Sequence, residues 1–175
     1  MVMQTVYLIG RYVWFFLIYS FLGALAETIF RLITEHQVYG IHDFLHLPIF
    51  PIYGIGALLV ITLLQKRVHN VILLFIAGAL IATVLEYSAH FLIEAIFNEK
   101  IWDYTHTPFN FDGRVSLLSS IGFGVVTVLL VRVIHPRLEK LFSRLPNRVN
   151  VIIAIIVFIV IVTDVVISII ERLGN

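Results

Sequence analysis

Long apolar segments with almost no charge constrain this chain more than any other feature of its sequence. There are five, running from about 6 to 33, 49 to 65, 71 to 97, 115 to 134 and 151 to 170. A helix needs about 20 mainly apolar residues to cross a bilayer, where backbone groups must find their hydrogen bonds within the protein. The pattern therefore predicts an all-α polytopic integral membrane helix bundle of about five transmembrane helices, with residues 1–175 as a single transmembrane domain.

The overall composition excludes an ordinary soluble core. Of 175 residues, 60% are hydrophobic and 13% are charged, whereas about a quarter of a soluble domain is charged. The chain has no Cys, so neither a disulfide framework nor thiolate chemistry is available to it. Its basic residues gather in two loops and form no stripe of their own. Membrane lipids are therefore the expected surroundings, and no nucleic-acid partner is expected.

The first apolar segment also imitates a cleavable signal peptide. Arg11, the apolar run 13–22 and Ala24-Leu25-Ala26 fit that pattern. However, the apolar pattern continues through residues 29–33, and the charged region before the run is weak. We interpret the segment as a retained membrane helix.

Basic residues predict the orientation in the cell membrane. In a five-helix topology one side holds Lys66, Arg67, Arg132, Arg137, Lys140, Arg144 and Arg148, and the other holds Arg31, Lys100, Arg114 and Arg172. Cytoplasmic loops carry the excess of Lys and Arg. The N-terminus is therefore expected in the cytoplasm and the C-terminus outside it. A second segment that re-enters the membrane without crossing it would reverse the orientation of the three later segments.

Carboxylates occur inside three of the apolar segments. Glu86, His90 and Glu94 recur at four-residue spacing and so share one helix face. Glu27 and Asp164 belong to other segments, at a similar depth in the outer half of the membrane. A charge at the bilayer centre costs at least about 2.5–3.5 kcal/mol, so such residues face a bundle interior or a water-filled cavity. We predict one acid-rich pocket in the outer half, suited to a cation or a proton.

Two other interpretations of these charges remain open. Glu27 with Arg31, and a carboxylate with Arg114, can pair simply to hold helices together. Glu86, His90 and Glu94 could also ligate a divalent metal from one helix face, although their order is not that of the zinc peptidases. No cofactor and no metal are predicted, and these three residues remain the weak metal candidates.

The loop after the third segment is unusually rich in aromatic residues. Trp102, Tyr104, Phe109 and Phe111 fit an aromatic belt at the membrane interface. They also fit a lid over the acidic pocket, or a surface that stacks on a cationic ligand. The interleaved polar residues are Asp103, Asn110, Asp112 and Arg114. Because a plain belt would not need these, we expect an ordered loop that folds back on the bundle.

Several short motifs together resemble a known family. They are Tyr19-Ser20-Phe21-Leu22-Gly23 with Glu27, Pro51-Ile52-Tyr53-Gly54-Ile55-Gly56, Leu85-Glu86-Tyr87, Glu94, Trp102-Asp103-Tyr104 and Phe109-Asn110-Phe111-Asp112-Gly113-Arg114. Over residues 19–136 they resemble the CmpB-like family of small polytopic membrane proteins, labelled "putative ABC-transporter permease". Residues 46–50 and Ala24 depart from the family pattern, which leaves the conformation of the first loop open.

The resemblance implies site residues and a transport role. It adds Tyr53, Trp102, Asp103, Tyr104 and Asn110 to the charged candidates. The complete predicted pocket is Glu27, Arg31, Tyr53, Glu86, His90, Glu94, Trp102, Asp103, Tyr104, Asn110, Arg114 and Asp164. The chain has no nucleotide-binding motif, so an ATPase would have to be a separate chain or another membrane subunit would have to supply the energy.

Three functions compete at this stage. The first is a transporter or a transporter-associated subunit for a cation, a proton-linked solute or a lipid headgroup. The second is a membrane enzyme acting on a lipid-like substrate, with Glu86 or Glu94 as acid or base and Arg31 or Arg114 holding a phosphate. The third is a structural or regulatory membrane protein whose charges only specify helix packing. An enzyme is the less favoured of the first two.

Overall fold

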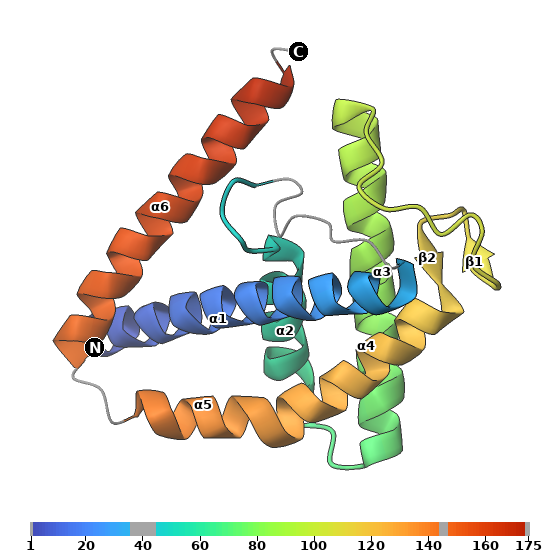
Figure 1. Cartoon of the computed structure of the whole chain (residues 1–175). Coiled ribbons are helices and arrows are strands. Elements are labelled where there is room, and N and C mark those ends of the chain that lie inside the picture. The colour runs from blue at the N-terminus through green and yellow to red at the C-terminus, as the bar shows by residue number, and fades with distance from the viewer. Residues whose placement is uncertain (1, 36–44, 144–146, 174–175) are drawn as a thin grey trace. The chain divides into compact units, whose positions relative to one another are not determined.

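A computed structural model describes residues 2–35, 45–143 and 147–173, and most of them are helical (Figure 1). The helices are α1 (Val2–Glu35), α2 (Pro51–Leu64), α3 (Val71–Phe97), α4 (Leu117–Leu129), a π-helical turn η1 (Leu130–Ile134), α5 (His135–Phe142) and α6 (Asn147–Leu173). Two strands of two residues each, β1 (Asn110–Phe111) and β2 (Val115–Ser116), form a small hairpin. The predicted all-α class is confirmed.

Four helical stretches are long and apolar enough to cross a membrane. They are Ile9–Ile29, Val71–Phe97, Leu117–Phe142 and Asn150–Leu173. The helix α2 has 14 residues, which at ~1.5 Å per residue gives about 21 Å. A hydrocarbon core is about 30 Å thick, so α2 is too short to cross it as a straight helix.

The chain forms two compact units. Unit 1 contains residues 1–55 and 141–175, and unit 2 contains residues 56–140. Each unit is described below by itself. The single transmembrane domain expected from the sequence stays a prediction.

In unit 1, α1 packs against α6. The indole Nε1 of Trp14 donates a hydrogen bond to the carbonyl oxygen of Asn150 at 3.3 Å, and Gly10 lies against Val151. Further along, a small apolar cluster joins Leu45, Ile49 and Ile161. The segment that leads into α2 is thereby attached to α6.

Small residues let α1 and the start of α2 approach closely. A side chain at Gly23 would overlap the Tyr53 ring, and one at Gly54 would overlap Ser20 and the backbone oxygen of Phe16. Small residues permit such contacts in membrane helices, where packing replaces the hydrophobic driving force. At Gly54 the backbone of α2 is therefore in close contact with α1.

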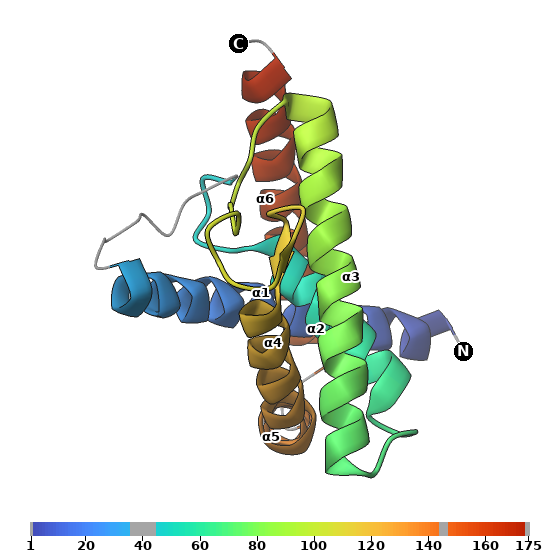
Figure 2. The same cartoon turned by 90° about the vertical axis from the view of Figure 1, so that its right-hand side faces the viewer.

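In unit 2, α3 and α4 run antiparallel and side by side (Figure 2). Gly78 of α3 lies against Thr127 of α4, and the Thr83 and Ser120 hydroxyls share a 2.7 Å hydrogen bond. At the far end, Arg132 donates to the carbonyl oxygens of Val68 and His69.

Local capping explains where these two helices begin and end. Asn70 caps the start of α3 by accepting from the Leu73 amide at 3.0 Å. Asn98 ends α3 in the left-handed conformation, with φ of 55°, which asparagine tolerates better than most residues. Ser116 and Ser119 form a reciprocal capping box at the start of α4.

Because the fourth apolar segment ends at about 134 and the fifth begins at about 151, the sequence predicts a connecting loop between them. This prediction is wrong for residues 135–142, which are helical. There α5 continues directly from α4 through the turn η1. Pro136 has no N–H and would clash with the carbonyl one turn earlier. The wider turn accommodates it, since the His135 amide bonds to the Leu130 carbonyl five residues back.

Candidate functional site

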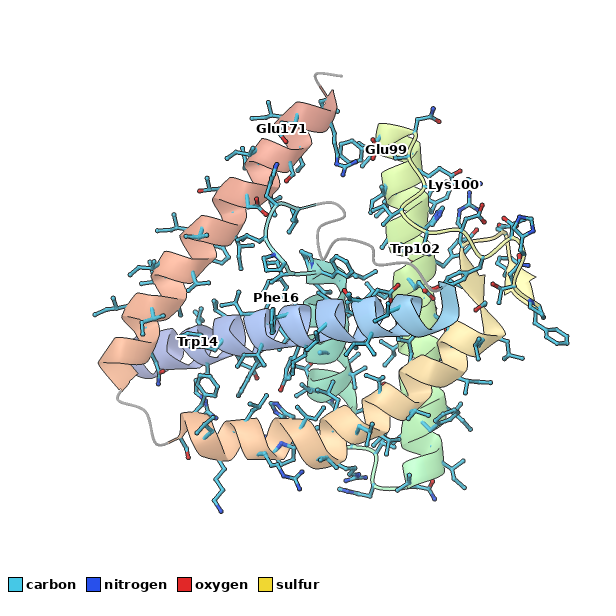
Figure 3. All side chains as sticks on the ribbon, viewed as in Figure 1. Trp14, Phe16, Glu99, Lys100, Trp102 and Glu171 are labelled. Atoms are coloured by element: carbon cyan, nitrogen blue, oxygen red, sulfur yellow. The ribbon has the colours of Figure 1, made fainter. Side chains whose placement is uncertain are left out.

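The polar face of α3 is covered in unit 2 by residues 98–116, which we call the lid loop. The first turn of α4 lies alongside Glu86, and the lid loop bonds to Glu86, His90 and Glu94 along the last three turns of α3. Figure 3 shows Trp102 of this loop beside α3, with Glu99 and Lys100 at the C-terminal end of the helix. Beneath the loop, Glu86 is 6% and His90 is 2% exposed.

A tight turn and one asparagine fix the shape of the lid loop. Asp112 and Gly113 both have positive φ, 54° and 65°, as the Asp-Gly turns of β-hairpins require. The Asn110 amide donates to the carbonyl oxygens of Thr105 and Thr107 and accepts from the Gly113 amide. The loop is therefore ordered by its own polar residues, as the interleaving of polar and aromatic residues predicts.

Glu86 accepts hydrogen bonds from two neutral hydroxyls. Tyr104 of the lid loop donates to Oε1 at 3.0 Å, and Ser119 of α4 donates to Oε2 at 3.3 Å. One buried carboxylate thus connects α3, α4 and the loop. A carboxylate within a spanning helix is costly unless such donors or water satisfy it.

His90 holds the loop through one ring nitrogen and leaves the other without a hydrogen bond. Its Nε2 lies 2.9 Å from the Trp102 carbonyl oxygen; because a carbonyl can only accept, Nε2 carries the hydrogen. Its Nδ1 is buried and has no hydrogen-bond partner among the described residues. The nearest carboxylate oxygen, Glu94 Oε2, is 3.6 Å away. A proton taken up at Nδ1 would therefore face a carboxylate.

Arg114 joins the hairpin to α3. Its guanidinium donates to Glu94 at 2.8 and 3.2 Å and to Asp112 at 3.1 Å, and its carbonyl oxygen accepts from the Trp102 indole at 2.8 Å. The same guanidinium lies over the rings of Tyr87 and Phe91. The hydrogen bond to Glu94 raises the pKa of Arg114 further, so this side chain stays charged.

Removing Arg114 is expected to release the lid loop. In Arg114→Met the carboxylates of Glu94 and Asp112 lose their shared partner, while the apolar length of the side chain is kept. We expect amide hydrogen exchange in residues 103–113 to become about tenfold to a hundredfold faster. Lys100→Met removes a positive charge from the same loop and should leave the exchange unchanged. Equal exchange in both variants would show that Arg114 does not hold the loop.

The stability of the lid loop is expected to depend on pH through Asp103. The Thr105 hydroxyl and then the Thr105 amide donate to its carboxylate, and these bonds lower the pKa of Asp103. Because the pKa of Asp103 is lower in the folded loop than in the unfolded chain, the ionised carboxylate stabilises the folded loop at pH values above the ordinary pKa of aspartate. This stabilisation is lost as the pH falls through the lowered pKa. Exchange of the Thr105 amide, corrected for its intrinsic rate, should accelerate as the pH falls below the ordinary aspartate range and through the lowered pKa of Asp103. Asp103→Asn should remove that pH dependence; if it persists, Asp103 is not its source.

In unit 1, Glu27 of α1 pairs with Tyr53 of α2. The Tyr53 hydroxyl donates to Glu27 Oε2 at 2.7 Å, next to the close contact between Gly23 and the Tyr53 ring. The side chain of Arg31 lies outside the described residues, so the expected pairing of Glu27 with Arg31 stays a prediction.

Asp164 of α6 has partners in the segment before α2. It accepts from the Leu47 amide at 3.1 Å and contacts His46 Nδ1 at 3.1 Å. Ser168 lies 3.3 Å from the same nitrogen, and Glu171 lies 3.2 Å from His46 Nε2. Among the described residues, Asp164 thus serves to attach residues 45–47 to α6.

The structure therefore brings the predicted residues together in three groups. The largest lies in unit 2 and contains Glu86, His90, Glu94, Trp102, Asp103, Tyr104, Asn110 and Arg114. Glu27 with Tyr53, and Asp164 with His46, form the two groups of unit 1. That all three groups share one pocket stays a prediction.

Sequence reasoning missed several partners in these groups. They are His46, Tyr87, Ser116, Ser119, Ser168 and Glu171. Only the Ser116 and Ser119 pair carried a local signal, because serines three residues apart before an apolar run form a helix start. Over the part of the chain that the structure describes, no three His, Cys, Asp or Glu residues are grouped to hold a metal ion.

Comparison with known proteins gives one match. A family model described as "Putative ABC-transporter type IV" matches residues 14–169. No curated protein and no solved structure matches the chain.

Proposed function

The chain belongs to the family described as "Putative ABC-transporter type IV", and on this premise we propose that it is a transporter or a transporter-associated membrane subunit. We assign the pocket beneath the lid loop to a proton or a small cation. Its four long apolar helices make the chain a membrane protein. We assign any ATP hydrolysis to a partner of this membrane domain, because these 175 residues contain no nucleotide-binding motif.

The observation that carries this proposal is the buried nitrogen of His90. Its Nδ1 has no hydrogen-bond partner among the described residues, although a buried polar atom normally has one. One proton added there would make the imidazole a cation whose Nδ1 lies 3.6 Å from the Glu94 carboxylate, within ion-pair distance. A site that takes up a proton has this character, since the buried imidazole then gains a partner of opposite charge.

Neighbouring groups support passage of a proton. Glu86 lies one helical turn from His90 on the same face of α3, and Tyr104 reaches its carboxylate at 3.0 Å. Carboxylates and imidazoles are the groups that proton relays in membranes use, and here the Tyr104 hydroxyl donates to the carboxylate of Glu86.

The enzymatic alternative has less support. It needs Arg31 or Arg114 to hold a phosphate; the side chain of Arg31 lies outside the described residues, and the Arg114 guanidinium already donates to Glu94 and Asp112. A phosphate would have to displace two carboxylates, and leave both without their partner. The same Arg114 contacts favour a purely structural role. A structural role and a transport role differ in whether Glu86 and His90 exchange protons.

We further propose the orientation that the basic residues predict, with the N-terminus in the cytoplasm and the C-terminus outside. This orientation requires α2, together with the residues that flank it, to cross a locally thinned bilayer, because its 14 helical residues alone are too short. Support comes from the basic residues of the turn 66–70 and of residues 132–148, which the positive-inside rule places in the cytoplasm. The pocket would then open in the outer half of the membrane.

The experiment that tests the function is proton flux. The purified chain is reconstituted in vesicles that enclose a pH-sensitive dye, and a potassium diffusion potential drives protons inward. Vesicles from membranes that normally contain the protein, compared with vesicles lacking it, provide a second preparation with any partner chain present. We expect faster acidification than in protein-free vesicles. Flux at the background level in both preparations would contradict a proton-conducting role.

A further inference from the structure

The four aromatic residues of the lid loop do two different things. Trp102 and Tyr104 face inward, where the indole bonds to the Arg114 carbonyl and the phenol bonds to Glu86. Phe109 and Phe111 face outward, with 82% and 63% of their surface exposed. From the sequence alone, an aromatic belt and a lid are alternatives for all four residues. In the structure, Trp102 and Tyr104 take the position expected of a lid, and Phe109 and Phe111 take the position expected of a belt.

The backbone holds Phe109 outward at a cost. Its φ is 56°, in the left-handed region where a bulky side chain is rarely found. Such a conformation costs on the order of 1 kcal/mol and persists only where its surroundings impose it. Here Asn110 imposes this conformation. Its side-chain amide bonds inward to the loop backbone, so the neighbouring side chains of Phe109 and Phe111 lie on the outward face.

Phe109 is also fixed at the level where a spanning helix begins. Its carbonyl oxygen accepts from the amide of Leu117, the first residue of α4, at 3.2 Å. Leu117 and Leu118 in that first turn are themselves exposed and apolar. The first turn of a spanning helix lies close to the boundary between headgroups and hydrocarbon, where aromatic rings are enriched.

We propose that the two outward phenylalanines insert into the lipid of the surrounding bilayer. The occupant of this surface is then the boundary between the headgroups and the acyl chains, beside the exposed apolar start of α4. The charges near the hairpin are compatible with this occupant, because Arg114 is paired with Glu94 at 2.8 Å and with Asp112 at 3.1 Å, so its charge would not be desolvated without a partner. The lid loop is thereby attached to the protein on one face and to the membrane on the other.

Single-cysteine spin labelling tests the proposal directly. The chain contains no cysteine, so Phe109→Cys and Phe111→Cys each give one labelling position. Each labelled variant is placed in vesicles of phosphatidylcholine and phosphatidylglycerol, and collision with oxygen is compared with collision with a water-soluble nickel chelate. Lys100→Cys, an exposed position in the same loop, is the matched control.

We expect oxygen to relax the labels at 109 and 111 more than the nickel chelate does, with the reverse order at 100. Faster relaxation by the chelate at all three positions would overturn the proposal, because the hairpin would then lie in water. Protection from both agents at 109 and 111 would overturn it as well, since a second copy or another protein would then cover this surface. Unchanged helical circular dichroism of each variant shows that it has folded. None of these outcomes depends on proton movement.

Discussion

Replacing Glu86 by glutamine is expected to reduce proton flux to that of protein-free vesicles without unfolding the protein. Glutamine has the same shape, and its oxygen can still accept from Tyr104 at the 3.0 Å that the carboxylate uses. Its amide cannot release or take up a proton near neutral pH. Packing of α3 against α4 should therefore survive while transfer stops. The measurement is dye-reported acidification under a potassium diffusion potential, together with a thermal melt in detergent.

His90→Gln should give the same loss, because glutamine can still donate to the Trp102 carbonyl but offers no titrating nitrogen. Two matched controls lie in the exposed part of the lid loop, Glu99→Gln and His106→Gln. Both should retain the wild-type flux. If Glu86→Gln and His90→Gln conduct as well as these controls and melt at a lower temperature, the two residues serve packing alone.

Replacing Gly78 by alanine is expected to destabilise unit 2 by about 1–3 kcal/mol, although alanine is the better helix former by ~1 kcal/mol. The added methyl group would overlap the branched side chain of Thr127 on α4. A branched side chain in a helix has little rotamer freedom with which to move aside. The two helices would have to separate, and the contact between Thr83 and Ser120 would weaken with them. Thermal or detergent-induced unfolding measures the loss.

Gly122→Ala is the control for this effect. Gly122 lies in the middle of α4, and a methyl group there would meet no atom within 4 Å. Its stability should be unchanged or slightly raised. Combining Gly78→Ala with Thr127→Gly should restore much of the lost stability, because the overlapping atoms are removed. A Gly78→Ala protein as stable as Gly122→Ala would show that α3 and α4 do not pack at this contact.

The sequence predicts the helices well because its strongest signals are local. Each of the five apolar segments contains a helix, and α3 runs from Val71 to Phe97 as expected because asparagines at 70 and 98 cap it. The continuation through residues 130–142 could not be predicted. Pro136 normally ends a helix, and the wider turn that accommodates it depends on packing that the local sequence does not show.

The site is partly predictable for the same reason. Four-residue spacing is enough to place Glu86, His90 and Glu94 on one face. It does not tell which aromatic residues of the loop turn inward, because that depends on the positive φ of Phe109 and on the inward bonds of Asn110. The contact between His46 and Asp164 joins residues 118 positions apart, a separation at which a single sequence gives no pairing signal.

The start of α4 is chemically coupled to the carboxylate of Glu86. The Ser119 hydroxyl has one hydrogen but two acceptors within reach, the Ser116 carbonyl at 2.9 Å and Glu86 at 3.3 Å. It can donate to only one of them at a time. A change in the charge of Glu86 therefore changes how often the Ser119 hydroxyl donates to Glu86 and how often to the Ser116 carbonyl. Because the second bond stabilises the first turn of α4, the opening of that turn changes with the charge of Glu86. Amide exchange at Ser119 and Ser120 would then report a change in the charge of Glu86, even where the proton or ligand that causes it is not identified.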